Sequence, residues 1–356
     1  MKEIGKQEMD DMLVGSAILG TGGGGSLERA RKNVKKDFDR GEKFELVSLD
    51  ELDDEEMLAS PYFCGSLTPE DDEKEKGVAH TYNAVDVLEQ HLGKKFSAMI
   101  ATEIGAGNLA IAFSTAVKCG VPLVDADPAG RSVPELSHTT FHVYDVPIDP
   151  IGVSDGKNRV LIEDVEDDFV AEKIARSIAV SLGGTAGVCD HPGTAKDMRG
   201  TLIEDSVTKS LEIGKKRRQA IENGVDPVEK ITEGSDGAKL FEGEITDYQW
   251  EEKSGFTVGE VLIENEEEDE MKIWFKNEHL MSWVNDEAYV TAPDLISIVT
   301  KDEAKPILNP NVKKGQSVAV LGFKADNKWR SDKGLEVLSP KYFDFDIEYT
   351  PMEEII

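Results

Sequence analysis

The segment 97–135 constrains the fold of this chain more than any other. It contains two short apolar runs, residues 98–101 and 121–124, and each run leads into acidic residues and glycine. Runs of this kind are typical of buried parallel strands that end in a polar loop. Between them, residues 109–120 are apolar at helical spacing and end at glycine. The segment therefore predicts a strand, a helix and a second strand, as in an α/β domain.

Polar side chains follow both predicted strands at the point where each strand ends. Open α/β sheets bind their ligands at the carboxyl ends of the strands. We therefore expect a group of candidate site residues along one rim of the sheet, namely Glu103, Asn108, Asp125, Asp127, Arg131 and Glu135.

Alternating elements elsewhere extend this α/β pattern. The spacing of apolar residues predicts a first helix over 9–19, strand-like segments over 44–52 and 61–69, and helices over 83–93, 169–182 and 201–223. Residues 139–153 and the following NRVLIEDV look β-rich, and a loop between the last two helices carries Cys189, Asp190 and His191. From residue 240 onward, apolar and polar residues alternate as in antiparallel strands. We expect an α/β domain over 1–235 with a largely parallel or mixed sheet, and a β-rich, barrel-like domain over 236–356.

A glycine run, GTGGGGSLERA, connects the first helix to a basic second helix. Ser26 is a plausible N-cap for that second helix, and the backbone N–H groups of Gly23, Gly24 and Gly25 can hold a carboxylate or another anion. A tight turn would need the same residues. No strand precedes the glycines and no Lys-Ser/Thr pair follows them, which excludes a dinucleotide fingerprint and a phosphate-binding P-loop.

The charge balance excludes several classes of partner. The 356 residues carry a net charge of −31, from 71 acidic against 40 basic residues, which argues against nucleic acid and against anionic membranes. We expect an exposed acidic surface of the kind found in salt-adapted proteins, with acidic runs at 50–56, 70–76 and 264–270 in exposed segments. No apolar run is long enough to cross a bilayer and the start lacks a signal-peptide core, so we expect a cytoplasmic protein. The three separated cysteines indicate neither a disulfide framework nor a thiolate zinc site.

The carboxylates are the most informative candidate catalytic groups. Asp125 and Asp127 are one residue apart, so on extended backbone they face the same way and can share a cation or a proton. Glu103 and Glu135 can complete such a site, and Arg131 can clamp a substrate carboxylate. The alternative is that the aspartates cap a turn and that Arg131 pairs with one of them.

The histidines offer fewer candidates. His138 and His142 are four residues apart, but their β-prone context predicts a strand, where they would lie roughly 13 Å apart; His142 is the better ligand candidate. For His191 there are two alternatives: it binds a metal or transfers a proton, or it is simply exposed in a loop. The remaining three histidines, His80, His91 and His279, look exposed and receive no role.

Several stretches together resemble one known family. These are GTGGGGSLERA, TEIGAGN, PLVDADPAGRSVPEL, GGTAGV, GTLIEDSVTKSLEIGK and GLEVLSPKYFDFDIEYTPME, and the sequence is similar through them to the S-methyl-thiohydantoin desulfurase family over nearly its whole length. This chain has Ser26 where the family usually has Asp, and His138 where many relatives carry a residue that cannot bind a metal. The resemblance implies two domains, an α/β part and a β-rich part, with a division nearer 165.

The resemblance also implies a function. It implies hydrolytic replacement of sulfur by oxygen in a thiohydantoin ring, with a divalent metal such as zinc, in a pathway that passes hydantoins to a hydantoinase. A bound metal would activate water and accept the departing sulfur. Its expected ligands are Asp125, Asp127, His142 and His191, while the glycine run, Ser26, Asn108 and Arg131 would hold the substrate. A binding or accessory protein that works with a hydantoinase is the alternative. The ring, the metal and the number of subunits, including a homo-oligomer, stay open.

Overall fold

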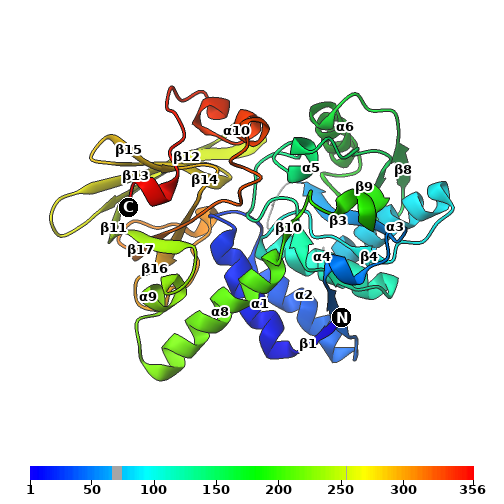
Figure 1. Cartoon of the computed structure of the whole chain (residues 1–356), viewed down its shortest axis with the longest axis horizontal. Helices are drawn as coiled ribbons and strands as arrows, with labels where there is room; N and C mark the ends of the chain where they lie inside the picture. The colour runs from blue at the N-terminus through cyan, green and yellow to red at the C-terminus, as the bar shows by residue number, and fades with distance from the viewer. Residues whose placement is uncertain (66–73, 254) are drawn as a thin grey trace. The chain divides into compact units, whose positions relative to one another are not determined.

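The computed structural model describes residues 1–65, 74–253 and 255–356 (Figure 1). The chain forms two compact units, each assembled from separate stretches of sequence. The α/β unit contains Met1–Met9, Gly25–Ala129 and Glu135–Thr208. The β unit contains Asp10–Gly24, Gly130–Pro134 and Lys209–Ile356. The predicted division at 235 falls just before β11 (Gly237–Lys253), the first strand of the second sheet.

An eight-stranded mixed sheet forms the centre of the α/β unit, as predicted. Its spatial order is β1 (Lys2–Ile4), β2 (Phe44–Val47), β5 (Leu123–Val124), β4 (Ala98–Met99), β3 (Met57–Gly65), β9 (Thr185–Thr194), β7 (Ile151–Ser154) and β8 (Arg159–Ile162). The four strands β2, β5, β4 and β3 pair in parallel. Antiparallel pairs extend the sheet on both sides.

The unit predicted from residues 97–135 is present. Strands β4 and β5 are parallel neighbours, and α4 (Ala106–Cys119) connects them. Helix α4 ends at Gly120, whose φ of 73° lies in the left-handed region that glycine reaches without strain. Beyond β5, a small ladder pairs β6 (Ala126–Asp127) with β10 (Ile203–Glu204).

Helices cover both faces of the eight-stranded sheet. Helix α3 (Lys74–Leu92) packs closely on β7 and β9 at two glycines. A Cβ at Gly152 would meet the Ala84 carbonyl oxygen at 2.2 Å, and a Cβ at Gly187 would meet the His80 backbone at 2.3 Å. The next residues, Val153 and Val188, point to the opposite face. There they share an apolar cluster with α6 (Asp168–Ser181). The remaining helices of this unit are α2 (Leu27–Asp39), η1 (Leu49–Glu51), α5 (Thr140–Val143) and α7 (Ala195–Met198).

The β unit contains a seven-stranded antiparallel sheet that curls into a half-barrel (Figure 1). Its order is β15 (Glu287–Thr291), β14 (Glu278–Val284), β13 (Glu270–Lys276), β12 (Phe256–Glu264), β11, β17 (Ser317–Phe323) and β16 (Leu295–Thr300). Register shifts in β11 between Lys239 and Phe241 and between Ile245 and Asp247 mark bulges, which increase local twist and bend the strand. The concave side encloses a core of aliphatic side chains that includes Ile245, Val261, Ile273, Ile298 and Val320.

Helices α1 (Lys6–Leu19) and α8 (Ser206–Asn223) pack closely within the β unit. A Cβ at Gly15 would lie 1.8 Å from the Ser210 carbonyl oxygen, and one at Gly214 would lie 1.8 Å from that of Asp11. The Arg218 guanidinium donates to both carboxylate oxygens of the nearly buried Asp11. The other short helices are α9 (Pro227–Thr232), η2 (Asn309–Asn311), α10 (Asp332–Val337), η3 (Pro340–Phe343) and η4 (Met352–Glu354).

Three expectations about local structure were wrong. Residues 140–143 form helix α5 instead of a strand, because the Thr139 side chain caps the helix by accepting from the His142 N–H. The stretch with Cys189, Asp190 and His191 is not a loop but part of β9, held between β3 and β7. Thr201 does not open α8, since its hydroxyl donates to the Met198 carbonyl and the helix begins at Ser206.

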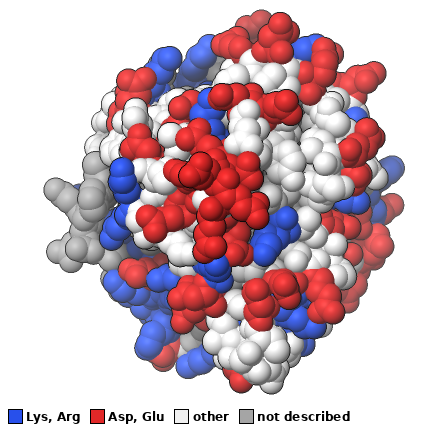
Figure 2. Space-filling model, turned by 90° about the vertical axis from the view of Figure 1, so that its left-hand side faces the viewer, with Lys and Arg blue, Asp and Glu red and all other residues white. Residues whose placement is uncertain are grey.

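The predictions of exposure had mixed outcomes. His80 is 6% exposed and His279 is fully buried, contrary to the prediction, whereas the His91 side chain is 35% exposed. Figure 2 shows acidic side chains gathered in patches on one face of the molecule. The acidic run at 70–76 and the strand-to-loop segment at 61–69 lie in part outside the described residues. Among the described helices, none combines the length and the apolar character that a membrane span requires.

Candidate functional site

The side chains of Asp190 and His191, consecutive residues of β9, form a buried dyad in the α/β unit. His191 Nδ1 lies 2.8 Å from Asp190 Oδ1, and the Tyr62 hydroxyl of β3 donates to Asp190 Oδ2 at 2.9 Å. The three side chains are removed from solvent, with exposures of 1% for Asp190, 3% for His191 and 6% for Tyr62. Low local dielectric strengthens such charge-assisted bonds.

The free end of the dyad is the Nε2 atom of His191. Within the described part of the chain, this buried atom has no hydrogen-bond partner. Buried polar atoms are almost always paired, so an orphan of this kind requires an explanation such as catalysis or a ligand. The His191 φ of 45° is in the left-handed region, which non-glycine residues occupy at a cost. The Phe141 ring stacks on the imidazole at 4.3 Å and fixes its plane.

The partners define the proton positions of the dyad. A carboxylate accepts only, so Nδ1 of His191 carries the proton and donates it to Asp190. The lone pair of Nε2 can then accept a proton. Burial, followed by the negative charge of Asp190, raises the pKa of Tyr62 well above its usual value. Tyr62 therefore stays protonated and acts as a donor that orients the carboxylate.

Two further buried hydroxyls near the dyad are also unsatisfied among the described residues. Ser60 lies opposite Asp190 in the β3–β9 ladder, and its Oγ has no partner. Thr140, which precedes the stacking residue Phe141, has an Oγ1 atom without a partner. A buried hydroxyl of this kind is a group that a polar ligand or an ordered water can satisfy.

The cysteines of the chain are poor nucleophiles. Burial raises the pKa of the Cys64 thiol, raises that of Cys119 to about 12 and raises that of Cys189 well above its usual value. The thiolate is the reactive form of cysteine. A covalent thiolate mechanism therefore has little support, although Cys189 directly precedes the dyad.

The second histidine considered as a ligand makes a separate ion pair. His142, in α5, places Nδ1 2.6 Å from Oδ2 of Asp168, the first residue of α6. Phe169 packs edge-on against the imidazole. His142 and His191 therefore contact different carboxylates.

The aspartate pair after β5 is engaged with the backbone. Asp125 accepts from the N–H and the hydroxyl of Thr208 in the first turn of α8, and burial raises the pKa of the Asp125 carboxyl. Asp127 is fully buried, and its Oδ2 accepts from the Ala129 N–H at 2.9 Å. These contacts correspond to the capping alternative. A catalytic role for either aspartate stays a prediction.

The other predicted rim residues have varied surroundings. Glu103 is 8% exposed and accepts from the Asn108 amide, and the backbone carbonyl of Glu135 accepts from the His138 N–H. Ser26 caps α2 by accepting from the Arg29 N–H, as predicted. Gly25 has a φ of 84°, and a Cβ there would come within 3.0 Å of the Cα of Gly107.

Within the β unit, the glycine run contacts β14. A Cβ at Gly22 would meet the His279 ring at 2.7 Å, and a Cβ at Gly23 would meet Glu278 Oε1 at 1.9 Å. Gly24 has a φ of 72°. Glycine is required here by close packing and backbone conformation, and anion binding by this loop stays a prediction.

Arg131 is a buried cross-link of the β unit. Its side chain is fully buried, and its guanidinium donates five hydrogen bonds at 2.8 to 3.1 Å, to the carbonyls of Ser132, Pro293, Asp294 and His279 and to the Thr21 hydroxyl. These bonds use the donor capacity of the guanidinium. Its predicted role as a substrate clamp has no support from these contacts.

The four predicted metal ligands have separate partners in the structure. Asp125, Asp127, His142 and His191 each hold a different partner, and the described residues contain no group of three or more His, Cys, Asp or Glu side chains placed to coordinate a metal. Binding of a divalent ion such as zinc stays a prediction from the resemblance.

Sequence reasoning missed Tyr62 and underrated Asp190. An adjacent acid and histidine in a stretch with β-prone neighbours was the available signal, but the glycines around it favoured a loop. Tyr62 is 128 positions away from Asp190, so only the pairing of β3 with β9 reveals the contact.

Comparisons with known proteins agree with the fold described here. Family models of the S-Me-THD-like N-terminal domain and the S-Me-THD-like C-terminal domain match residues 7–164 and 166–352. A structural-genomics X-ray crystal structure of a protein from Chromobacterium violaceum is similar, with a TM-score of 0.82 and 22% sequence identity over 99% of this chain and 100% of that one. No curated protein matches the sequence. The chain therefore belongs to the S-Me-THD-like family, with both of its domains.

Proposed function

We propose that this protein is a hydrolase that replaces sulfur by oxygen in a small, neutral five-membered ring of the thiohydantoin type. The observation that carries the proposal is the Nε2 atom of His191, which is buried, is oriented through Asp190 and has no hydrogen-bond partner among the described residues. An imidazole held in this way is suited to take a proton from an attacking water. The family name supports the choice of ring.

The proposed reaction needs one proton acceptor that later acts as a donor. His191 Nε2 accepts a proton from water as the water oxygen bonds to the ring carbon that bears sulfur. The carbon–sulfur bond then breaks as the added oxygen becomes the ring carbonyl. The second water proton goes to the sulfur of a thiohydantoin or to the adjacent ring nitrogen of a methylthio-substituted ring, and the imidazolium returns its proton to the departing hydrosulfide or thiolate. Asp190 stabilises the imidazolium formed between these steps, and Tyr62 holds Asp190 in place.

Neutral donors near the dyad suit a neutral substrate. The hydroxyls of Ser60 and Thr140 can donate to the ring oxygen or to the developing negative charge. Since the ring of a hydantoin carries no charge in its protonated form, it would not need a cation. The resemblance also implies a divalent metal. The steps above are written for the residues of this chain alone, and the assay below tests the effect of added zinc.

The test measures turnover of a panel of methylthio-substituted and unsubstituted thiohydantoins and hydantoins. The released thiol or sulfide is quantified with and without added zinc. We expect release by the wild type and a fall of at least about a hundredfold in His191→Gln, the range typical of a lost general base. His91→Gln is the matched control, because His91 is a partly exposed histidine that pairs with Glu163.

Two outcomes would contradict the proposal. Ligand binding without turnover in the wild type would favour the accessory role beside a hydantoinase. Normal turnover in His191→Gln would place the chemistry elsewhere in the molecule.

A further inference from the structure

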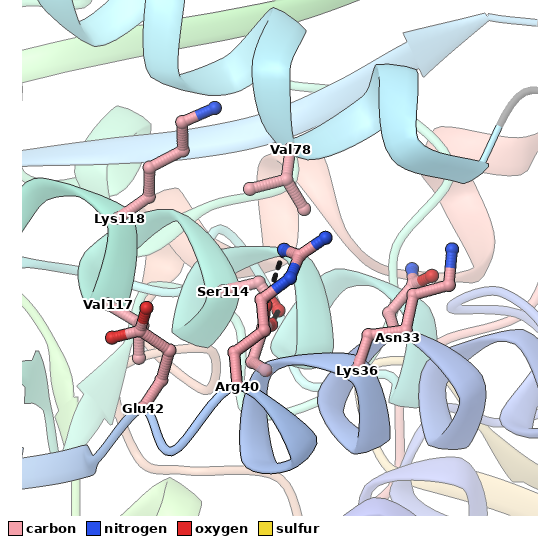
Figure 3. Close-up of a pocket in the computed structure, with 9 residues that line it drawn as sticks. Asn33, Lys36, Arg40, Glu42, Val78, Ser114, Val117 and Lys118 are labelled. Atoms are coloured by element: carbon pink, nitrogen blue, oxygen red, sulfur yellow. Dashed lines mark hydrogen bonds and ion pairs between the residues drawn. The ribbon is translucent and has the colours of Figure 1, made fainter.

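The carboxylate in the cavity between α2, α3 and α4 of the α/β unit is paired within the protein (Figure 3). Asp37 accepts from the Ser114 hydroxyl at 2.7 Å and lies 3.7 Å from the Arg40 guanidinium, with which it forms an ion pair. These contacts do not point to a ligand. A long hairpin of the β unit differs, because one of its backbone edges lacks a partner strand.

One edge of β11 is open over its last residues. Strand β17 pairs with β11 only from Gly237 to Glu244, whereas β12 continues along the opposite edge as far as Lys253. Among the described residues, no backbone–backbone hydrogen bond outside the β11–β12 ladder reaches 247–253. The residues from Gln249 to Lys253 are all exposed. An unpaired strand edge presents N–H and C=O groups that can pair with another chain.

The outer edge of β16, at the end of the same sheet, is covered. The Thr300 N–H donates to the Lys305 carbonyl at 2.9 Å, and the Ile307 N–H donates to the Ile298 carbonyl at 3.0 Å. Covering an edge with a following segment is a common protection against edge-to-edge association. The end of β11 has no such cover within the described part of the chain.

The open stretch contains a large exposed aromatic side chain. Trp250 is 54% exposed. It lies on the same face of β11 as Tyr248, whose ring stacks on Phe275 at 5.9 Å. Tryptophan is enriched at the centres of protein interfaces. Trp250 can therefore anchor a contact made along this edge.

The charges along β11 exclude most ways of pairing two copies. Residues directly opposite each other in an antiparallel pair point to the same face, so a two-fold pairing of identical strands places one residue opposite itself. A register centred on Gln249 would place Asp247 opposite Glu251. Registers centred on Glu251 or Glu252 would place a carboxylate opposite its own copy. Like charges directly opposite each other are destabilising.

The register centred on Trp250 contains no like-charge pair. From the centre outward, its pairs are Trp250 with itself, Gln249 with Glu251, Tyr248 with Glu252 and Asp247 with Lys253. Because the arrangement is two-fold, the pair of Asp247 with Lys253 occurs twice. Asp247 also accepts from the Gln249 amide at 2.7 Å, but that donor is neutral and leaves the negative charge available to Lys253.

We propose that the open edge of β11 pairs with the same edge of a second copy of this chain, in the antiparallel register centred on Trp250. The two sheets then continue into each other, and the two indole rings meet beside the two-fold axis. A standard protein interface buries about 1,600 Å² in total. Two short strand segments bury less, so the dimer is in reversible equilibrium with the monomer. This pairing is independent of the reaction proposed for His191.

Cysteine cross-linking of the full-length protein tests the register. Trp250→Cys places two thiols opposite each other, with Cα atoms about 4.5 to 5.5 Å apart, a separation that a disulfide spans. The matched control is Glu252→Cys, on the same face of the same strand, whose thiols would lie roughly 14 Å apart in this register. We expect mild oxidation to convert Trp250→Cys to a covalent dimer and to leave Glu252→Cys monomeric on non-reducing gels. Circular dichroism checks that both variants are folded.

Reversal of the charges tests the pair of Asp247 with Lys253. Asp247→Lys and Lys253→Asp each place like charges opposite each other at both ends of the pairing, and we expect each to raise the dimer Kd by about fivefold or more. The double variant Asp247→Lys/Lys253→Asp restores opposite charges and has the net charge of the wild type, so its Kd should return toward the wild-type value. Sedimentation velocity over a series of protein concentrations measures these constants.

Three results would overturn this proposal. The first is a wild type that stays monomeric at protein concentrations up to about 0.5 mM. The second is equal cross-linking of Trp250→Cys and Glu252→Cys, which would exclude the register. The third is a double charge variant that dimerises as weakly as the two single variants, which would exclude the pairing of Asp247 with Lys253.

Discussion

His191 Nδ1 and Asp190 Oδ1 lie 2.8 Å apart although the two residues are neighbours in a strand. Successive side chains of a strand point to opposite faces. The φ of 45° at His191 breaks that alternation and brings the imidazole beside the carboxylate. The strained backbone and the dyad are therefore one feature, in which local strain is used to orient a functional group.

This relationship predicts a graded loss of activity. Asp190→Asn should lower kcat by about tenfold or more with little change in KM, because the imidazolium loses its counter-charge and the proton on Nδ1 loses its acceptor. Tyr62→Phe should have a smaller effect, since it removes a donor that positions Asp190 and touches no reacting atom. Steady-state kinetics over a range of pH separates the two variants. Equal losses in kcat for both would contradict the assignment of Tyr62 as a positioning residue.

Glycine substitutions test why the run 22–25 lacks side chains. Gly22 and Gly41 have similar φ values of 89° and 82°, but a Cβ at Gly22 would meet His279 at 2.7 Å, whereas one at Gly41 meets nothing within 4 Å. Gly41→Ala should cost about 1 kcal/mol through its left-handed backbone alone. Gly22→Ala should cost roughly 2 kcal/mol more because it overpacks a buried site. Urea unfolding of the two variants measures the difference, and equal costs would show that packing is not the reason for glycine at position 22.

Replacement of the buried guanidinium tests the cross-link in the β unit. Arg131→Lys keeps the charge but loses the planar donor set, and several of the five bonded acceptors become unsatisfied. We expect a loss of roughly 3 kcal/mol or more in the free energy of unfolding. The exposed pair of Arg159 with Asp86 provides the control, and Arg159→Lys should cost less than about 1 kcal/mol. A loss of less than about 1 kcal/mol in Arg131→Lys would contradict this expectation and would mean that water hydrogen-bonds to the acceptors instead.

The carboxyl groups of Asp37 and Asp39 should affect the pH dependence of the free energy of unfolding in opposite directions. Burial raises the pKa of Asp37 in the folded state, so its stabilising contribution is full below the ordinary Asp value and is lost as the pH rises through the raised pKa. Asp37→Asn should therefore gain stability relative to the wild type between acid and neutral pH. The hydrogen bond from Lys35 lowers the pKa of Asp39, whose contribution is present at neutral pH and lost as the pH falls through the lowered pKa. Asp39→Asn should lose stability over the same interval, and urea titrations at both pH values compare the signs.

Local sequence signals predicted the elements that short-range physics controls. We correctly predicted β4, β5 and α4 from apolar runs and helical spacing, because such patterns are set by nearby residues. Ser26 was correctly predicted as an N-cap because capping depends on one residue and the turn that follows it. The antiparallel half-barrel followed from alternation in the same way.

The dyad and the buried arginine depend on partners distant in sequence. The arrangement of Asp190 and His191 requires β9 to be held between β3 and β7, and glycines at 184 and 187 made that stretch look like a loop. Helix α5 was missed because β-branched and aromatic residues favour a strand, whereas one capping threonine and the tertiary contacts selected a single helical turn. For Arg131, charge suggested a ligand, and only the folded chain reveals the carbonyls that surround it.

The discontinuous make-up of the β unit affects how the protein can be divided. Thr21 and Arg131 contribute to its interior, yet both come from the first half of the gene product, well before the point near residue 165 where the family models meet. A recombinant fragment that starts there would lack the two stretches that contain them and would expose bare carbonyls and apolar surface. Truncation would therefore yield aggregated material, and separately expressed halves would have to be reunited before either could adopt its native structure.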